Sequence, residues 1–438
     1  MARTGWIMVA GLLGGLGAVF GLAPAARATD FERDPVNYSA STPDNPVSRL
    51  QKRLDAGEVK LTYDERVGYL RSVLEQLGVP VSSQMLVFSK TSLQRERIRP
   101  ATPRALYFND DVYIGFCQGG TVVELSVVDP KLGAVFYTLD QEATDRPKFT
   151  RQTDTCLICH GSSQTQGVPG HVVRSVYADG EGFPILSSGS YRTDQTSPLK
   201  QRWGGWYVTG KSGPQRHLGN LVLRGRQAPE YVDNSAGVNV TDLGRLVKVD
   251  PYLAPTSDLV ALMVLEHQAD MHNLITRANF LTRAALHEEA EINKALGRPA
   301  DYRSDSTLSR IRSAGEPLVK YLLFSDEAKL EHKLEGVSAF AREFTARGPR
   351  DDKGRSLRDL DLQTRMFKYP CSYLIYSEPF DTLPAPVKDY VYRRLGEVLT
   401  GKDATPAFAH LTAADRPAVL EILRATKPNL PAALAGTP

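Results

Sequence analysis

The sequence predicts an α+β protein in which a small antiparallel β region is followed by a mostly α-helical C-terminal region. Between residues 105 and 139, four short runs rich in Val, Tyr, Phe and Ile alternate with turn-forming residues, as in an antiparallel meander. Beyond residue 255, apolar residues recur at helical spacing through several segments. At 438 residues the chain is long enough for two or three domains, or for one core with large additions.

Residues 29–104 are expected to form an N-terminal lead of helix and loop. Turn-forming residues crowd positions 34–46, and a charged helical stretch follows near Val47–Ala56. From Asp64 to Leu77 the apolar residues keep helical spacing, and the Gly-Val-Pro sequence that comes next ends that helix.

Residues 105–240 are expected to form a β-rich region. The strand-like runs are separated by Asp110, a Gly-Gly pair and an Asp-Pro-Lys-Leu-Gly turn, which favours hairpins between successive strands. The runs are Ala105–Asn109, Val112–Cys117, Val122–Val128 and Val135–Leu139. A glycine-rich stretch from residue 161 to 225 has shorter strand-like pieces at His171–Tyr177, Trp203–Thr209 and Leu218–Leu223.

Residues 241–438 are expected to be mostly helical. The strongest helical pattern covers Pro255–Ala295, where apolar residues keep one face for about eight turns. Further helices are expected near Gly315–Leu323, Asp326–Arg342, Leu357–Phe367, Val387–Leu399 and Arg416–Thr426.

The first 28 residues have the pattern of a secretory signal peptide. Arg3 precedes an apolar stretch from Trp6 to Leu22, and Ala26-Arg27-Ala28 fits the small-x-small cleavage rule, so we expect export to the periplasm with cleavage after Ala28. A retained membrane anchor is the alternative, but the stretch contains five glycines and is short of the roughly 20 apolar residues that a span needs. No later segment is predicted to cross a membrane.

Charge and cysteine content narrow the function classes. Cleavage after Ala28 would remove Arg3 and Arg27 and no acid, so the formal charge falls from +3 to +1. A nearly neutral chain argues against a nucleic-acid partner, which requires a clustered basic surface.

Cys117 and Cys371 stand alone in the sequence, and either one long-range disulfide or two buried free thiols would fit them.

The run Thr-Asp-Thr-Cys-Leu-Ile-Cys-His-Gly carries the most specific chemistry in the chain. Cys156 and Cys159 lie three residues apart, on one face of a helical turn, so both thiols can add to the vinyl groups of one porphyrin. His160 follows directly and can ligate the iron. In an exported chain, Cys-x-x-Cys-His is the signature of covalently attached haem c.

Two other interpretations of the cysteine pair are weaker. A thioredoxin-like pair should open a helix after a strand of a βαβ unit, and a structural zinc site needs a second pair of ligands at short spacing. The adjacent histidine and the export signal both favour haem.

Trp203 and Trp206, interleaved with glycines, either wall a flat cofactor or fill an irregular core.

Through Thr155–Gly161 the chain resembles the c-type cytochromes, and more loosely the large exported bacterial proteins that contain one cytochrome c domain. The resemblance implies one covalent haem c with His160 as its proximal axial ligand. The chain departs from the small cytochromes c, whose distal methionine follows some tens of residues after the motif, because its first methionine after His160 is Met263. It has no second Cys-x-x-Cys-His, which disfavours a dihaem peroxidase.

The distal iron ligand decides between functions, because a strong protein ligand makes an electron carrier and an open position admits small molecules. We rank His267 first, His217 second and Met271 third, although methionines on an apolar helix face commonly fill cores. The wider set of candidates also includes His171, Met263 and His272.

Three functions follow from these alternatives. The first is one-electron transfer in the periplasm with an unidentified redox partner protein. The second is a haem-dependent oxidoreductase, peroxidase-like or oxygenase-like, acting on a small molecule at an open iron, with Arg216 or His217 nearby. The third is a haem-based sensor or binding module read by the helical region.

Overall fold

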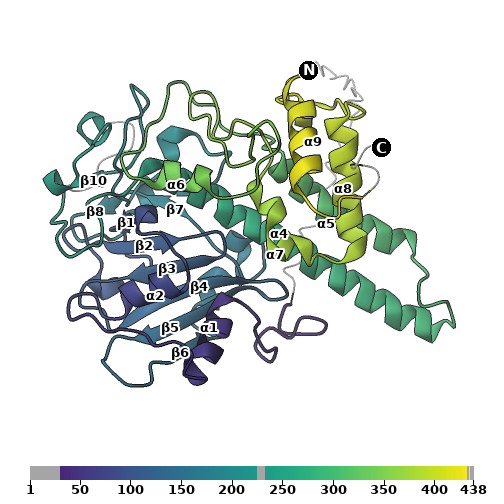
Figure 1. The fold of residues 1–438 in the computed structure, drawn as a ribbon, viewed down its shortest axis with the longest axis horizontal. Helices are drawn as coiled ribbons and strands as arrows, with labels where there is room; N and C mark the ends of the chain where they lie inside the picture. The colour runs from purple at the N-terminus through teal and green to yellow at the C-terminus, as the bar shows by residue number, and fades with distance from the viewer. Residues whose placement is uncertain (1–29, 224–231, 432–433, 435–438) are drawn as a thin grey trace, which may run out of the picture.

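The computed structural model describes residues 30–223, 232–431 and 434, so the signal peptide expected over residues 1–28 lies outside the described residues. The described chain has an antiparallel sheet in its N-terminal half and a mostly helical C-terminal region, which confirms the α+β prediction. Figure 1 shows the sheet beside a long helix, with the C-terminal helices gathered at one end of the molecule.

The main sheet has six strands that pair in chain order, each antiparallel to the next. The four predicted runs are confirmed as its central strands, while the two edge strands are only three and four residues long and were not predicted. The first edge strand belongs to the lead that was expected to be helix and loop. The strands are β1 (Met85–Val87), β2 (Arg104–Phe108), β3 (Val112–Phe116), β4 (Val122–Asp129), β5 (Gly133–Asp140) and β6 (Phe149–Gln152).

Each face of the sheet has its own apolar cluster, because side chains alternate between faces along a strand. On β4, Val123, Leu125 and Val127 join the cluster that the N-terminal helices α1 (Pro46–Asp55) and α2 (Leu70–Gln76) cover. The opposite face contributes side chains such as Tyr113, Phe108 and Val128 to the cluster that includes the long helix α4 (Leu259–Ala295). Helix α2 starts later than predicted, because Asp64 and Gly68 bond to each other as an isolated bridge.

Helix α4 is 37 residues long and confirms the strongest helical prediction. It begins at Leu259 because the carboxylate of Asp258 accepts the N–H groups of Val260 and Ala261, at 2.8 and 3.3 Å. Helix α5 packs on α4, α8 on α5, and α9 on α8, which confirms three further helical predictions. The α-helices that follow α4 along the chain are α5 (Asp305–Leu322), α6 (Phe340–Ala346), α7 (Glu378–Asp381), α8 (Ala385–Leu399) and α9 (Asp415–Thr426).

Two helical predictions are wrong: Asp326–Arg342 is helical only from Phe340 onward, and Leu357–Phe367 contains no helix. The two segments are irregular chain and turns that bond to each other: the N–H of Leu330 donates to Thr364 O and the N–H of Leu334 to Leu362 O. An Asx turn also breaks the second segment, where the carboxylate of Asp361 accepts two backbone N–H groups ahead of it. Helical spacing alone could not reveal this pairing.

The glycine-rich stretch forms short strands and one-turn helices, and it bonds to the β1 edge of the sheet, where the Tyr207 N–H donates to Leu86 O at 2.9 Å. β7 (Arg174–Val176) pairs antiparallel with β9 (Ser190–Arg192), and β8 (Ala178–Asp179) pairs parallel with β10 (Val222–Leu223).

Among the helices of the described residues, none has the length and apolar composition needed to cross a bilayer. Cys117 and Cys371 are buried free thiols, so the structure has two separate cysteines where a long-range disulfide was one alternative.

Candidate haem attachment site

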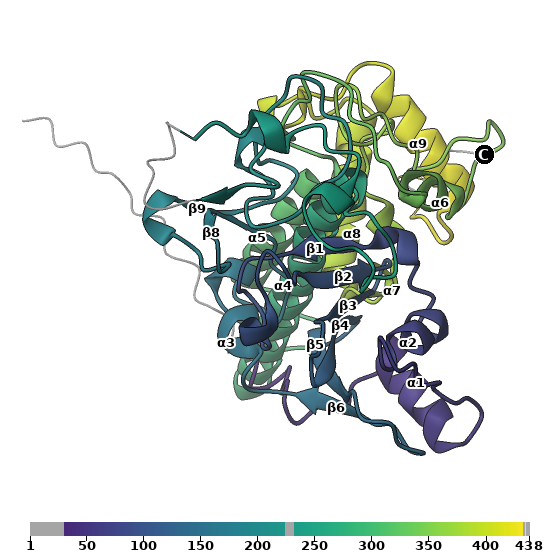
Figure 2. The same ribbon diagram turned by 90° about the vertical axis from the view of Figure 1, so that its left-hand side faces the viewer.

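The Cys-x-x-Cys-His motif forms a one-turn helix, α3 (Leu157–His160), directly after the edge strand β6. The His160 N–H donates to Cys156 O at 3.0 Å, which closes the turn and places the two cysteines on one side of it. Cys156 is half-buried, Cys159 is exposed, and both are free thiols. Ile158, between them, is 77% exposed, so the motif borders solvent. Figure 2 shows α3 at the edge of the molecule, on the same side as β8 and β9.

The imidazole of His160 has a defined orientation. Its Nδ1 lies 2.9 Å from the carbonyl oxygen of Gly170, and because a carbonyl only accepts, Nδ1 carries the proton and Nε2 keeps its lone pair. The ring packs against Phe136 of β5 with centroids 4.9 Å apart. Burial lowers the pKa of His160, which favours the neutral imidazole that a metal binds.

The segment after the motif returns to it and closes a small loop. The Gly170 N–H donates to His160 O at 2.8 Å, so Gly170 and His160 are joined by two hydrogen bonds, one backbone and one side chain. Inside the loop, the buried Thr165 hydroxyl lies within hydrogen-bonding distance of His160 O, at 3.2 Å, and of Val168 O, at 2.7 Å. The loop therefore holds His160 through both its backbone carbonyl and its imidazole.

A partly buried ion pair on the sheet contributes charge near the motif. Arg104 of β2 and Glu124 of β4 lie 2.5 Å apart, and both act electrostatically on Cys156 and His160. The guanidinium lies across Gly115, where a Cβ would come within 2.1 Å of it, and its Nε is buried without a hydrogen-bond partner. A donor left unsatisfied beside the motif fits an acceptor supplied by a bound group.

The electrostatics argue against a redox cysteine pair. Burial, with the negative charges of Glu124 and Asp154, raises the pKa of Cys156 to about 11. Disulfide oxidoreductases instead lower the pKa of the attacking thiol. Among the described residues, no group of three or more His, Cys, Asp or Glu side chains is arranged to hold a metal ion.

The first-ranked distal ligand, His267, lies in the core with both ring nitrogens in hydrogen bonds. Nδ1 lies 2.6 Å from Gln195 Oε1 and Nε2 lies 2.8 Å from Ser372 Oγ. The ring stacks between Tyr321 and Phe324, and burial lowers its pKa to about 3. In this arrangement His267 has no free nitrogen to offer iron, so we do not carry it forward as the distal ligand.

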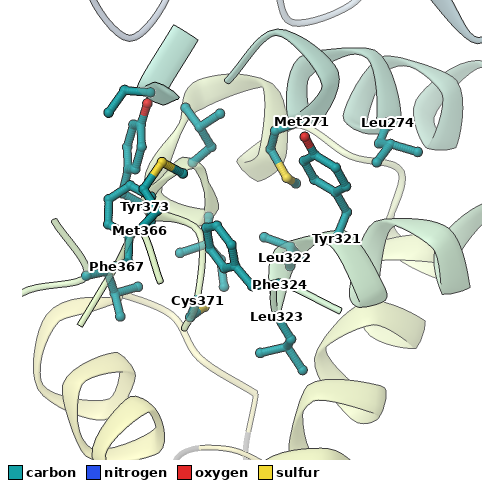
Figure 3. Close-up of a cluster of buried hydrophobic side chains, with 14 of the residues drawn as sticks. Met271, Leu274, Tyr321, Leu322, Leu323, Phe324, Met366, Phe367, Cys371 and Tyr373 are labelled. Carbon is teal, nitrogen blue, oxygen red and sulfur yellow. The ribbon is translucent and has the colours of Figure 1, made fainter. Parts of the chain in front are cut away.

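The other two ranked candidates are also buried. His217 is 3% exposed, its Nδ1 accepts the Gly219 N–H at 3.1 Å, and its ring packs against Trp203. Met271 is fully buried in the apolar cluster of Figure 3, among residues that include Tyr321. Among the described residues, no contact joins His217, His267 or Met271 to His160. None of these three side chains is therefore assigned as a distal ligand.

The two tryptophans of the glycine-rich stretch pack in the core. Trp203 is 1% exposed and Trp206 is 5% exposed, and both belong to the cluster around α4. The indole N–H of Trp206 donates to Arg174 O at 2.8 Å. Of the two interpretations open for these residues, the irregular core describes where they lie.

His171, one of the unranked candidates, is buried near His160, and burial, with the charges of His272 and His160, lowers its pKa. Its Nε2 lies 2.7 Å from Ser126 Oγ of β4, its ring lies 4.2 Å from that of Tyr113, and its Nδ1 is buried without a partner. His171 was a candidate only through its place in the glycine-rich stretch that follows the motif, and nothing else in the sequence distinguished it. Asn273, which holds the same segment, carried no signal at all.

The residues present fit a covalent haem. Cys156 and Cys159 are free thiols on one helical turn, the Nε2 of His160 is unprotonated, and Arg104 keeps an unsatisfied buried donor beside them. Comparison with protein-family models, with curated proteins and with solved structures found no match to this chain.

Proposed function

We propose that this chain is a periplasmic c-type haem protein that carries out one-electron transfer. Cys156 and Cys159 would hold the haem through thioether bonds, and His160 would ligate the iron through Nε2. The observation that carries the proposal is the 2.9 Å bond between His160 Nδ1 and Gly170 O, which fixes the tautomer that a proximal ligand needs. When bound, haem iron supplies a one-electron redox couple.

The residues around the motif support this function by what they hold and what they leave accessible. The Gly170 carbonyl holds the imidazole proton on Nδ1 and increases the basicity of the other nitrogen. Arg104 offers a guanidinium to a propionate, with Glu124 limiting the net charge. Cys159 and Ile158 are exposed, so a redox partner protein can approach the attachment site.

Covalent attachment is tested by expressing the full-length chain together with a cytochrome c maturation system. Haem should stay with the wild-type protein through a denaturing gel and be lost when Cys156 and Cys159 are both changed to Ala. Cys117→Ala, which removes a buried thiol outside the motif, is the matched control and should retain haem. Covalent haem that persists in the double variant, or none in the wild type, would refute the proposal.

An open-iron oxidoreductase is the second candidate, favoured by the saturated hydrogen bonding of His267. Carbon monoxide binding to the reduced holoprotein separates the two functions. A spectrum unchanged by carbon monoxide supports electron transfer with a protein distal ligand, and a shifted Soret band supports a small-molecule site.

A further inference from the structure

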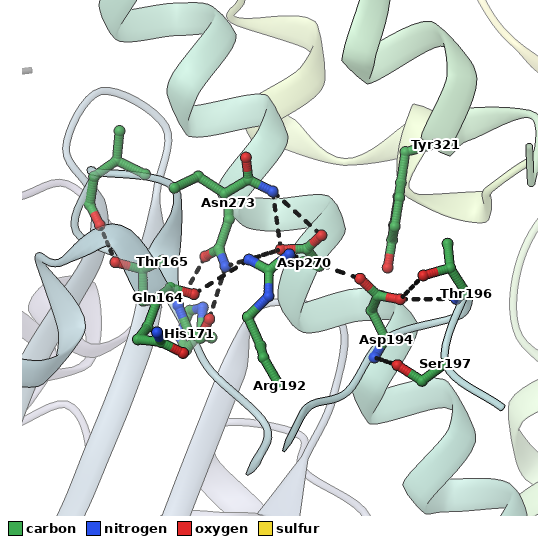
Figure 4. A network of polar contacts seen from close by, with 12 residues as sticks. Gln164, Thr165, His171, Arg192, Asp194, Thr196, Ser197, Asp270, Asn273 and Tyr321 are labelled. Carbon is green, nitrogen blue, oxygen red and sulfur yellow. Dashed lines mark hydrogen bonds and ion pairs between the residues drawn. The ribbon is translucent and has the colours of Figure 1, made fainter. Parts of the chain in front are cut away.

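The side chain of Asn273 joins helix α4 to the segment that follows the motif. Its Oδ1 accepts the N–H of His171 at 2.8 Å and its Nδ2 donates to His171 O at 2.7 Å. Asn273 is 1% exposed, and Figure 4 shows it between the helix and the loop. One amide therefore holds both backbone groups of the residue next to Gly170.

The peptide unit between Gly170 and His171 links Asn273 to the candidate iron ligand. Its carbonyl oxygen accepts from His160 Nδ1, and its N–H donates to Asn273 Oδ1. Because a peptide unit is planar, fixing its N–H also fixes the direction of its carbonyl. A hydrogen bond at the N–H also polarises the unit and makes its oxygen a stronger acceptor.

The approach of Asn273 requires glycine at position 170. A Cβ there would lie 2.2 Å from Asn273 Oδ1 and 3.1 Å from the Cβ of Thr165, so neither neighbour leaves room for a side chain. The close packing of helix and loop is therefore part of how this peptide unit is held.

A second contact, one helical turn earlier, fixes the same loop. The Asp270 carboxylate accepts from Gln166 Nε2 at 3.2 and 3.3 Å and pairs with Arg192 Nη1 of β9 at 3.3 Å. Residues 270 and 273 share a helix face, so α4 holds the loop at two points. Figure 4 shows Asp270 with Arg192, beside Asn273.

We propose that Asn273 is a positioning residue for His160. It orients the Gly170–His171 peptide so that the imidazole keeps its proton on Nδ1 and leaves Nε2 free. The inference rests on the proposed function in taking Nε2 as the iron ligand. A firm Nδ1–H···O bond makes the imidazole a more basic ligand, which stabilises oxidised iron and lowers the reduction potential.

The experiment compares midpoint potentials of full-length holoproteins. Asn273→Ala should retain covalent haem and shift the one-electron equilibrium about tenfold toward the reduced form, a rise of about 59 mV. Gly170→Ala disturbs the same contact from the loop side and should shift the potential in the same direction. Asn293→Ala is the matched control and should cause no shift, because Asn293 is an equally buried amide of α4 that donates to Tyr302 O.

A second readout does not depend on haem. In a chain with Cys156 and Cys159 changed to Ala, ¹⁵N NMR of His160 should show the Nδ1–H tautomer, and adding Asn273→Ala should give a mixture of tautomers. An unchanged tautomer together with an unchanged potential would overturn the inference. Absence of covalent haem in the wild type would overturn the proposed function instead, and the tautomer would still decide whether Asn273 positions His160.

Discussion

At the residue scale, hydrogen bonding separates the histidines of this chain into different roles. His160 has one nitrogen bonded to a backbone carbonyl and the other without a proton, whereas both nitrogens of His267 are used inside the core. Gln195 Oε1 can only accept, so Nδ1 of His267 carries its proton and Nε2 accepts from the Ser372 hydroxyl. This is the pattern of a structural histidine.

The first prediction concerns His267. His267→Ala should lower the free energy of unfolding by about 3 kcal/mol, because it leaves a cavity and unsatisfied groups on Gln195 and Ser372. The visible spectrum of the folded holoprotein should not change. Denaturant unfolding and absorption spectroscopy measure the two effects. His287→Ala, on the exposed face of the same helix, is the control and should alter neither. A change of spin state in His267→Ala would restore it as a distal ligand.

At the element scale, α4 fixes the glycine-rich stretch as well as the motif loop. Glu266 of α4 is fully buried and pairs with Arg202 at 2.8 Å, and burial raises the pKa of this carboxyl. The guanidinium also donates to Ser197 O at 2.8 Å and to Gln195 O at 3.1 Å. One arginine therefore pairs with a carboxylate of the helix and hydrogen-bonds to two loop carbonyls.

Removing that arginine should be costly. Arg202→Met should lower the free energy of unfolding by about 3–5 kcal/mol, because it leaves a buried carboxylate without its ion-pair partner. Arg310→Met breaks the exposed pair with Glu288 and should cost less than about 1 kcal/mol. Both are measured by denaturant unfolding, and equal losses in the two variants would contradict this account of the buried pair.

At the scale of the whole molecule, one apolar cluster crosses the boundary expected near residue 241. It joins side chains of the sheet, such as Met85 and Tyr113, to those of the C-terminal helices. Titration of buried groups should therefore be seen in the stability of the whole molecule. Glu327 is one such group: burial raises its pKa to about 7, although its Oε1 accepts the Met366 N–H at 2.8 Å.

The pH dependence of stability tests Glu327. Between the usual carboxyl pKa of 4.5 and about 7, the folded state binds more protons at this group than the unfolded state, so the free energy of unfolding falls as pH rises. Glu327→Gln keeps the acceptor and removes the charge. It should stabilise the protein by on the order of 2 kcal/mol at pH 8 and leave it unchanged near pH 4.

Thermal unfolding across that pH range gives the measurement for Glu327. Glu331→Gln, at an exposed glutamate nearby, provides the control. The same stability difference between Glu327→Gln and wild type at pH 4 and at pH 8 would show that Glu327 does not titrate as described.

The sequence predicted those strands and helices whose residues form a local pattern. Runs of β-branched and aromatic residues located β2–β5, and apolar periodicity located α4, α5, α8 and α9. It misassigned residues 326–342 and 357–367 because their structure depends on bonds between distant segments. The motif could be recognised from five consecutive residues. The hydrogen bonds that hold it could not be predicted, because Gly170, His171 and Asn273 come together only in the folded chain.

The support for His160 comes from a part of the chain made much later than the motif. The sheet and α3 use residues up to 160, and Asn273 follows more than a hundred residues further on. During synthesis the motif is therefore complete while the helix that will hold its loop does not yet exist. Haem attachment, if it precedes the packing of α4, would act on a loop that lacks the Asn273 contacts, and α4 would then fix the site.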